Sequence, residues 1–356
     1  MPLVAHNDLP TFARLQEEGI RVLAPDFALH QDIRELHIGL LNMMPDAALS
    51  ATERQFFRLV GESNPIAQFY VHPFSLPQLP RSDEAQVYIE KYYEPFEVIR
   101  EQGLDALIVT GALPGPVLSE QPFWEPLKEV IDWALENVTS TLCSCLATHA
   151  MLEFRYGQKR IAQQKKIWGV FPHQVVDKSH PLVNDINTRF DVPHSRWNAV
   201  TREQFEAAGL RVLVEGKQGV HLATSADGLR VIFFQGHPEY DTISLLKEFK
   251  REVLLYASGE NEDFPPFPEN YFSDFEKAVI REYQLELDNS KAQGNVAPPF
   301  PEELIAQRLD NTWRDSAVEV VGNWMGTIYQ VTNSDRRIPF MVHIDPNDPL
   351  GLAKKP

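Results

Sequence analysis

The chain has 356 residues, of which 43% are hydrophobic and 23% charged, enough to bury one large core or a core with a small appendage. Its net charge of −17 excludes general attraction to nucleic acid, so an anionic ligand would need a local basic cluster. No apolar run approaches the ~20 residues of a membrane span, and residues 1–8 lack a signal-peptide pattern, so we expect neither membrane insertion nor secretion.

The first third of the chain predicts alternating strands and helices. Residues 1–34 indicate a short helix and strand packed on the main body, without recognisable chemistry. A first core strand is predicted at 36–41, a helix with one apolar face at about 49–60, and a second strand at 67–74. A central, fully apolar strand follows at 106–110.

An amphipathic helix is predicted at 124–135, because its apolar residues recur at i, i+3, i+4 and i+7: Leu127, Val130, Ile131 and Ala134. Strand and helix therefore alternate up to about residue 145. This alternation predicts an α/β fold with a mostly parallel central sheet flanked by helices. In such folds the chemistry lies at the carboxyl ends of the strands.

A strand-turn-helix junction is predicted at residues 138–152. β-Branched and small residues run as far as Cys145, and strong helix formers follow from Leu146. A thiol at such a junction stands clear of the sheet, and the helix amides, beginning with that of Leu146, favour both a thiolate and the oxyanion formed when it attacks an acyl group. The alternative is that Cys143 and Cys145, the two cysteines of the chain, are small buried hydrophobic residues.

The two cysteines also bear on the compartment. They are too close in the sequence for an ordinary stapling disulfide, so we expect a reducing, cytoplasmic environment in which a reactive thiol is tolerated. No metal-ligand spacing is recognisable around them or elsewhere, and we expect no metal.

A second motif supplies a histidine. The apolar run 231–234 ends in Gln235 and Gly236, is typical of a strand buried on both faces, and leads into His237 and Glu239. A lone histidine is more often structural than catalytic, but Cys, His and a carboxylate at the ends of separate strands are the minimal set for acyl transfer. Cys145 would then be the nucleophile, His237 the proton carrier and Glu239 the group that orients it.

The later segments are less informative alone. The basic stretch 159–166 is by default a solvated surface loop, Ser195 belongs to an ordinary turn, and Arg251 lies on a helix predicted at 242–256, where arginines are usually solvated. From residue 258 the composition becomes rich in proline and acidic residues, with a polar linker expected at 286–302.

We expect three parts: an N-terminal extension (1–34), a catalytic α/β domain (35–257), and a C-terminal linker and helical extension (258–356). Helices are predicted in the last part at 305–309 and 317–329. This extension is expected to wrap the core or to meet a partner subunit in a homodimer.

Several motifs, in order along the chain, resemble the homoserine O-succinyltransferase (homoserine O-acyltransferase) family of methionine biosynthesis, whose fold is similar to the class I glutamine amidotransferases. They cover roughly residues 35–275, and a weaker resemblance follows at 323–332. The motifs are 41–45 (LNMMP), 52–56 (TERQF), 107–112 (LIVTGA), 139–142 (TSTL), Cys145, 156–157 (YG), 169–170 (GV), 193–196 (PHSR), 236–241 (GHPEYD) and 270–272 (NYF).

The resemblance implies transfer of a succinyl group from succinyl-CoA to the hydroxyl of L-homoserine through a thioester on Cys145, with the coenzyme A thioester as co-substrate and no bound cofactor. It implies substrate contacts by Lys166, Ser195 and Arg251, the last offering a bidentate fork to a carboxylate. It also places Gly115 where acetyl-transferring members carry glutamate and succinyl-transferring members glycine. Glycine leaves room for the longer acyl chain and sets no negative charge against its carboxylate.

The resemblance leaves one part of the site open. In the family a backbone amide near the loop at 42–48 joins the amide after the nucleophile to bind the oxyanion. This chain has Asp46 and Ala47 where relatives commonly have lysine, and the loop is two residues longer.

Three other activities remain as alternatives. An acetyl-CoA-dependent homoserine O-acetyltransferase would use the same residues. A glutamine amidase would also use a Cys-His-Glu set, but no P-loop pattern accompanies it here. A non-enzymatic binding protein on this fold would be expected to lack a catalytic residue, whereas Cys145, His237 and Glu239 are all present.

Overall fold

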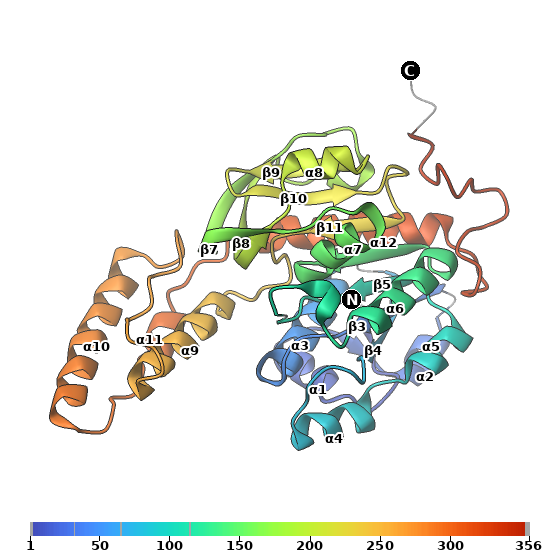
Figure 1. Cartoon of the computed structure of the whole chain (residues 1–356). Coiled ribbons are helices and arrows are strands. Elements are labelled where there is room, and N and C mark those ends of the chain that lie inside the picture. The colour runs from blue at the N-terminus through green and yellow to red at the C-terminus, as the bar shows by residue number, and fades with distance from the viewer. Residues whose placement is uncertain (1–2, 32, 65, 114, 353–356) are drawn as a thin grey trace.

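The computed structural model describes residues 3–31, 33–64, 66–113 and 115–352. Within these residues the strands form one 11-stranded sheet in the order β2-β1-β4-β3-β5-β6-β11-β10-β9-β7-β8 (Figure 1). The strands are β1 (Leu3–Val4), β2 (Val22–Leu23), β3 (Glu35–Leu41), β4 (Gln68–Phe74), β5 (Ala106–Val109), β6 (Ser140–Ser144), β7 (Ile161–Val175), β8 (Arg189–Ala199), β9 (Arg211–Gly216), β10 (Gly219–Thr224) and β11 (Val231–Phe234).

The α-helices lie between these strands and beyond them. They are α1 (Pro10–Glu17), α2 (Pro25–Leu29), α3 (Asp46–Ser63), α4 (Asp83–Tyr92), α5 (Phe96–Gln102), α6 (Trp124–Asn137), α7 (Leu146–Tyr156), α8 (Arg202–Ala207), α9 (Ser244–Ser258), α10 (Asp274–Gln293), α11 (Glu302–Ala306) and α12 (Arg314–Val331). Two short 3-10 helices, η1 (Leu118–Glu120) and η2 (Pro181–Val183), complete the regular structure of the described residues.

The sheet has a parallel part and an antiparallel part. From β2 through β11 in the sheet order each neighbouring pair is parallel, whereas β10, β9, β7 and β8 add on as antiparallel strands. The expected α/β class with a mostly parallel sheet is confirmed. The carboxyl ends of β5, β6 and β11 therefore lie side by side, where the predicted nucleophile and histidine leave the sheet.

Helices cover both faces of the parallel part. On β5, Ile108 belongs to a core shared with α1, α3 and α12, whereas Leu107 and Val109 belong to a second core shared with α5, α6 and α7. Alternate residues of a strand point to opposite faces, so a strand covered on both sides must be apolar throughout. This explains the uninterrupted apolar run predicted at 106–110.

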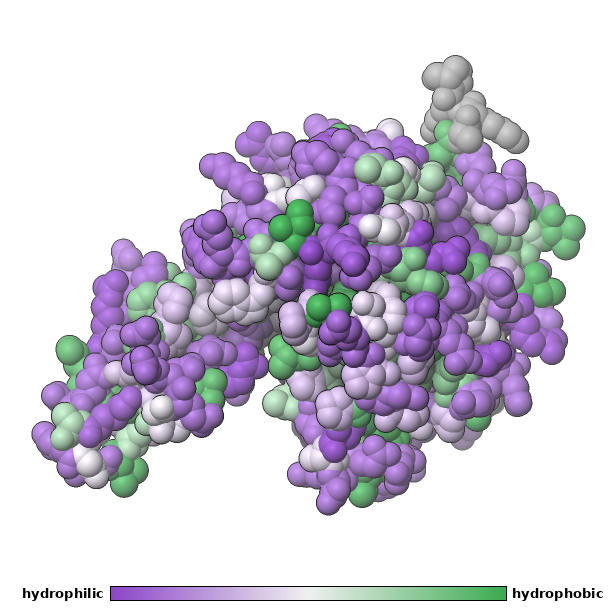
Figure 2. Space-filling model, in the orientation of Figure 1, coloured by the Kyte–Doolittle hydropathy of each residue, from purple (hydrophilic) through white to green (hydrophobic). Residues whose placement is uncertain are grey.

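Helices α9, α10 and α11 project from the body and have a hydrophobic core of their own (Figure 1). Phe249 of α9 and Ile280 of α10 pack there with Trp168 of β7, which joins this unit to the antiparallel strands. The face shown in Figure 2 is largely hydrophilic, with hydrophobic side chains scattered over it. No helix among the described residues is long and apolar enough to cross a membrane.

Three sequence expectations are wrong in this part of the chain. Ser195 lies within strand β8, paired with Trp168 of β7, and not in a turn. The basic stretch 159–166 enters strand β7 at Ile161 instead of forming a surface loop. The expected linker at 286–302 begins inside α10, which starts with a capping box between Ser273 and Glu276 and buries Leu287. The Ser-x-x-Glu capping motif is recognisable in the sequence. The helix itself was not predicted, because most residues of α10 are polar and its apolar residues form a single narrow stripe.

Candidate active site

Cys145 occupies a strained junction between β6 and α7. Its backbone has φ 51° and ψ −105°, a conformation that residues with a side chain rarely adopt, and α7 begins at the next residue. Its amide donates to the carbonyl of Phe234 at 2.8 Å, which ties the junction to the end of β11. Gly111 lies beside it, since a Cβ there would approach the Cys145 Cβ to 3.7 Å. The predicted elbow is therefore present, and the half-buried Cys145 thiol is at its apex.

Cys143 differs from Cys145 in burial and in position. It is fully buried inside β6, and burial raises the pKa of its thiol far above the ordinary value. A thiol in that state is an inert packing group.

His237 and Glu239 follow β11, as predicted. Nδ1 of His237 lies 2.8 Å from Oε1 of Glu239. With a proton on Nδ1, the ring donates a hydrogen bond to this carboxylate, which fixes the orientation of the ring. The His237 amide donates to the carbonyl of Pro193 at 2.9 Å. Gly236 permits this approach, because a Cβ there would lie 2.4 Å from Val192.

The remaining nitrogen of His237 is left for chemistry. Nε2 is buried and has no hydrogen-bond partner among the described residues. Burial opposes the charged form of this ring, but Glu239 and Cys145 outweigh it and raise the pKa of His237 well above its ordinary value. The histidine thus carries a proton beside the Cys145 side chain.

The amide of Leu146 is the first of α7, where helical amides have no intrahelical acceptor. It therefore suits the predicted oxyanion role. On the loop opposite, the amides of Met43 and Met44 already donate to Thr110 Oγ1 (2.9 Å) and Asn42 Oδ1 (3.2 Å). Neither is available as the second donor in this arrangement.

A second polar centre surrounds Glu248 of α9. Its Oε2 accepts hydrogen bonds from Ser195 (2.6 Å) and the indole of Trp168 (3.0 Å), and lies 3.2 Å from the Lys166 ammonium. Its Oε1 accepts the hydroxyl of Tyr240 at 2.7 Å. Two predicted substrate contacts, Lys166 and Ser195, thus meet on one carboxylate.

Glu248 is ionised in this setting. Burial would raise its pKa, but the Lys166 ammonium and the hydrogen bonds from Ser195 and Tyr240 outweigh burial and lower the pKa below its ordinary value. Tyr240 also stacks on His237, with ring centroids 4.2 Å apart. The Glu248 centre therefore adjoins His237.

The other two predicted residues, Arg251 and Gly115, make no hydrogen bond to Cys145, His237 or Glu248 among the described residues. Arg251 of α9 is exposed, and its guanidinium donates to the adjacent Glu252 at 3.1 Å; no contact given by the described part of the chain joins it to Cys145 or Glu248. Gly115 lies in the loop after β5, where its amide donates to Gln121 Oε1 at 3.1 Å. Pro114, which precedes it, is outside the described residues.

Two arginines that the sequence did not single out lie close to the nucleophile. Arg160 donates to the carbonyls of Gly115 (2.9 Å) and Pro116 (3.0 Å). Arg196 is buried and donates to the carbonyl of Gln218 at 2.6 Å. Burial lowers the pKa of both guanidinium groups, to about 10 for Arg196. The nearby Cys145 side chain acts in the opposite direction on the pKa of each arginine. Both therefore place a cation within electrostatic range of the thiol.

Comparison with known proteins identifies the family. A profile of the homoserine O-succinyltransferase family matches residues 2–334. The chain belongs to this family. Homoserine O-succinyltransferases of Allochromatium vinosum and Nitrosococcus oceani are 64% and 62% identical to it, each over 99% of both chains. A solved glutamine amidotransferase from Thermotoga maritima aligns with a TM-score of 0.45 and 10% identity, over 83% of this chain and 98% of its own.

For this member of the homoserine O-succinyltransferase family, sequence reasoning missed Glu248. One signal was available: Glu248 stands between Leu245 and Phe249 on the face of α9 that is buried. A carboxylate in an apolar face is rarely tolerated without partners, so its position indicated a buried polar centre.

Proposed function

We propose that this protein is a cytoplasmic enzyme of methionine biosynthesis that transfers a succinyl group from succinyl-CoA to the hydroxyl of L-homoserine. The observation that carries the proposal is the half-buried Cys145 at the strained β6–α7 junction, beside a His237 whose Nδ1 is fixed by Glu239 and whose Nε2 is uncommitted. Family membership supports the choice of acyl transfer over amide hydrolysis, which the same three residues could perform.

In the first half-reaction the Cys145 thiolate attacks the thioester carbonyl carbon, and the amide of Leu146 donates to the oxyanion. When the intermediate collapses, the bond to the coenzyme A sulfur breaks. The leaving thiolate takes the proton from Nε2 of His237 and departs as coenzyme A. The enzyme is left as a succinyl thioester with a neutral His237.

In the second half-reaction His237 acts as a base. Its Nε2 takes the proton of the homoserine hydroxyl while the oxygen attacks the acyl carbon. The bond to the Cys145 sulfur then breaks, which releases the ester and restores the thiolate-imidazolium pair. Glu239 stabilises the imidazolium formed in this step and holds the ring in one tautomer.

We assign homoserine binding to the Glu248 centre. Homoserine is a zwitterion, and Glu248 and Lys166 offer one charge of each sign. The ammonium of the substrate would pair with Glu248 and its carboxylate with Lys166, while Ser195 donates a hydrogen bond. Arg251 remains a predicted carboxylate contact that must reorient from Glu252 to reach the substrate.

The acyl group is assigned to the loop at Gly115. Arg160, held against the carbonyls of Gly115 and Pro116, supplies a cation for the distal carboxylate of a succinyl group. An acetyl group carries no charge that could pair with the Arg160 guanidinium. The charge of Arg160 therefore favours transfer of a succinyl group over an acetyl group.

The test is to incubate the protein with succinyl-CoA or acetyl-CoA and measure its intact mass, then add homoserine. We expect one succinyl mass per chain, discharged by homoserine. Gly115→Glu should reduce kcat/KM for succinyl-CoA by at least about 10-fold relative to acetyl-CoA, because like charges then meet. Gly115→Gln controls for size without charge. Efficient use of acetyl-CoA with no reaction of succinyl-CoA would refute the assignment, and glutamine hydrolysis without acylation would favour the amidase.

A further inference from the structure

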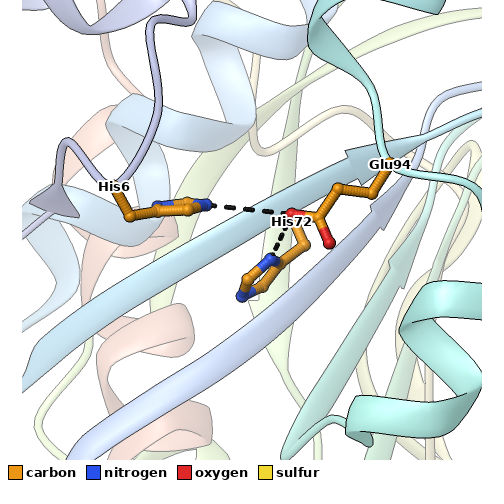
Figure 3. Close-up of side chains that lie close together, drawn as sticks. All are labelled: His6, His72 and Glu94. Carbon is orange, nitrogen blue, oxygen red and sulfur yellow. Dashed lines mark hydrogen bonds and ion pairs between the residues drawn. The ribbon is translucent and has the colours of Figure 1, made fainter.

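Three side chains from separate segments converge at the β1–β4 edge of the sheet (Figure 3). His6 follows β1, His72 lies in β4, and Glu94 lies between α4 and α5. Nδ1 of His72 is 2.6 Å from Oε1 of Glu94, and Nε2 of His6 is 4.0 Å from the same oxygen. One ligand atom of each residue lies within 4.8 Å of the other two. We propose that these three residues form a zinc site outside the active site.

The two histidines have the outer hydrogen bonds that metal-binding histidines need. Such a ligand usually donates the N–H of its other ring nitrogen to an acceptor, which fixes the tautomer. Nδ1 of His6 lies 3.1 Å from the carbonyl of Val4, so it carries the proton and Nε2 has a lone pair. That lone pair faces the side-chain amide nitrogen of Asn7 at 3.4 Å, a contact that zinc would replace.

His72 is supported through His37. Nε2 of His72 lies 2.8 Å from Nδ1 of His37, whose own Nε2 lies 3.1 Å from the carboxylate of Glu35. A chain of donors running from His72 to His37 to Glu35 leaves Nδ1 of His72 to bind a metal. The outer partners of both histidines are therefore in place.

One neighbouring charge opposes a cation here. Arg336 lies within electrostatic range of Glu94, so it limits the affinity of the site.

The geometry is close to that of a bound ion. Zinc lies about 2.0–2.2 Å from nitrogen and oxygen ligands in a tetrahedral arrangement, which puts ligand atoms roughly 3.3–3.5 Å apart. The pair His6–Glu94 must close slightly from 4.0 Å, and the pair His72–Glu94 must open from 2.6 Å as the proton between them is released. The side chains are 15%, 8% and 23% exposed for His6, His72 and Glu94, so solvent can supply the fourth ligand.

The segments that carry the ligands are held by the backbone. The amide of His6 donates to Val4 at 2.9 Å, and the amide of Glu94 donates to Pro73, next to His72, at 2.9 Å. Zinc would thus join the first strand, β4 and the α4–α5 connection, and would stabilise the folded chain in proportion to its binding.

The test uses the untagged full-length protein, stripped with a chelator and dialysed. Zinc titration by calorimetry should give one ion per chain, and zinc should raise the melting temperature. His6→Gln and Glu94→Gln remove ligands and should weaken binding by more than 100-fold. His37→Phe should weaken it by about 10–100-fold, because it removes an outer hydrogen bond.

The matched control is His343→Gln, which removes an exposed histidine elsewhere and should leave zinc binding unchanged. Circular dichroism of each stripped variant checks that it is folded. The proposal is overturned if His6→Gln binds zinc as tightly as the wild type, if the wild type binds none, or if His343→Gln loses binding to the same extent.

Discussion

The nucleophile centre and the Glu248 centre adjoin each other but are organised differently. Around Cys145, three buried polar atoms of the described residues have no hydrogen-bond partner: Oγ of Ser144, Nε2 of His237 and Oε2 of Glu239. Around Glu248, by contrast, both carboxylate oxygens are engaged, by Lys166, Trp168, Ser195 and Tyr240. The region proposed to react keeps one ring nitrogen, Nε2 of His237, available to give up and take back a proton, while the region proposed to bind holds partners that a substrate must exchange.

The sharpest test of this contrast compares the two cysteines. Cys145→Ala should abolish the acyl-enzyme and all measurable transfer, because no other thiol faces the site. Cys143→Ala should keep both, with a loss of stability of roughly 1 kcal/mol for a small buried side chain. Intact-mass spectrometry after succinyl-CoA treatment reads the outcome directly. Acylation of the Cys145 variant, with none in the Cys143 variant, would move the nucleophile to β6.

His237 and Glu239 should also differ. His237→Ala removes the proton carrier and should lower kcat by about 10²–10⁴-fold. Glu239→Gln should cost less, while lowering the pKa of His237, since the carboxylate no longer offsets burial. Steady-state kinetics and NMR titration of the ring measure the two effects. Wild-type kcat in the histidine variant would refute the mechanism.

On the binding side, Glu248→Gln should raise KM for homoserine about 10–100-fold, the size expected for a lost charged hydrogen bond. Acyl-enzyme formation from succinyl-CoA should be unchanged, because that step precedes homoserine. Glu282→Gln, which changes an exposed carboxylate of α10, is the matched control. A slowed acylation step with unaltered KM would assign Glu248 to the first half-reaction instead.

The smallest expected effect is a pH dependence of the free energy of unfolding. It comes from buried histidines whose pKa is lowered, unlike that of His237. Burial, aided by Arg196, lowers the pKa of His149 to about 3, and burial lowers that of His173 to about 4. At a pH between 6.5, the ordinary pKa of histidine, and these lowered pKa values, the two histidines bind protons in the unfolded chain but not in the folded chain. The free energy of unfolding should therefore fall by on the order of 1.4 kcal/mol per pH unit for each histidine as the pH drops through that window, and be independent of them above it.

Urea unfolding at pH 7.5 and 5.5 measures this dependence. His149→Gln should remove one histidine's share of the slope. An identical slope in the variant and the wild type would show that His149 is protonated in the folded protein.

The sequence predicted the parts of the molecule that follow directly from strand ends. Cys145 and His237 each come shortly after a buried strand, and parallel strands bring their carboxyl ends together, so proximity followed from local pattern alone. Glu248 could not be found that way, since its partners come from β7, β8 and the loop after β11. The His6–His72–Glu94 group was invisible for the same reason, because its members share no spacing and meet only through the pairing of β1 with β4.

The backbone at Cys145 has one more consequence, for evolution of the fold. A side chain held at φ 51° and ψ −105° costs on the order of 1–3 kcal/mol, which glycine at the same position would largely relieve. Selection for stability alone would therefore remove the thiol and keep the turn. We therefore expect a relative with glycine at this position to be more stable and to lack the reaction proposed for Cys145.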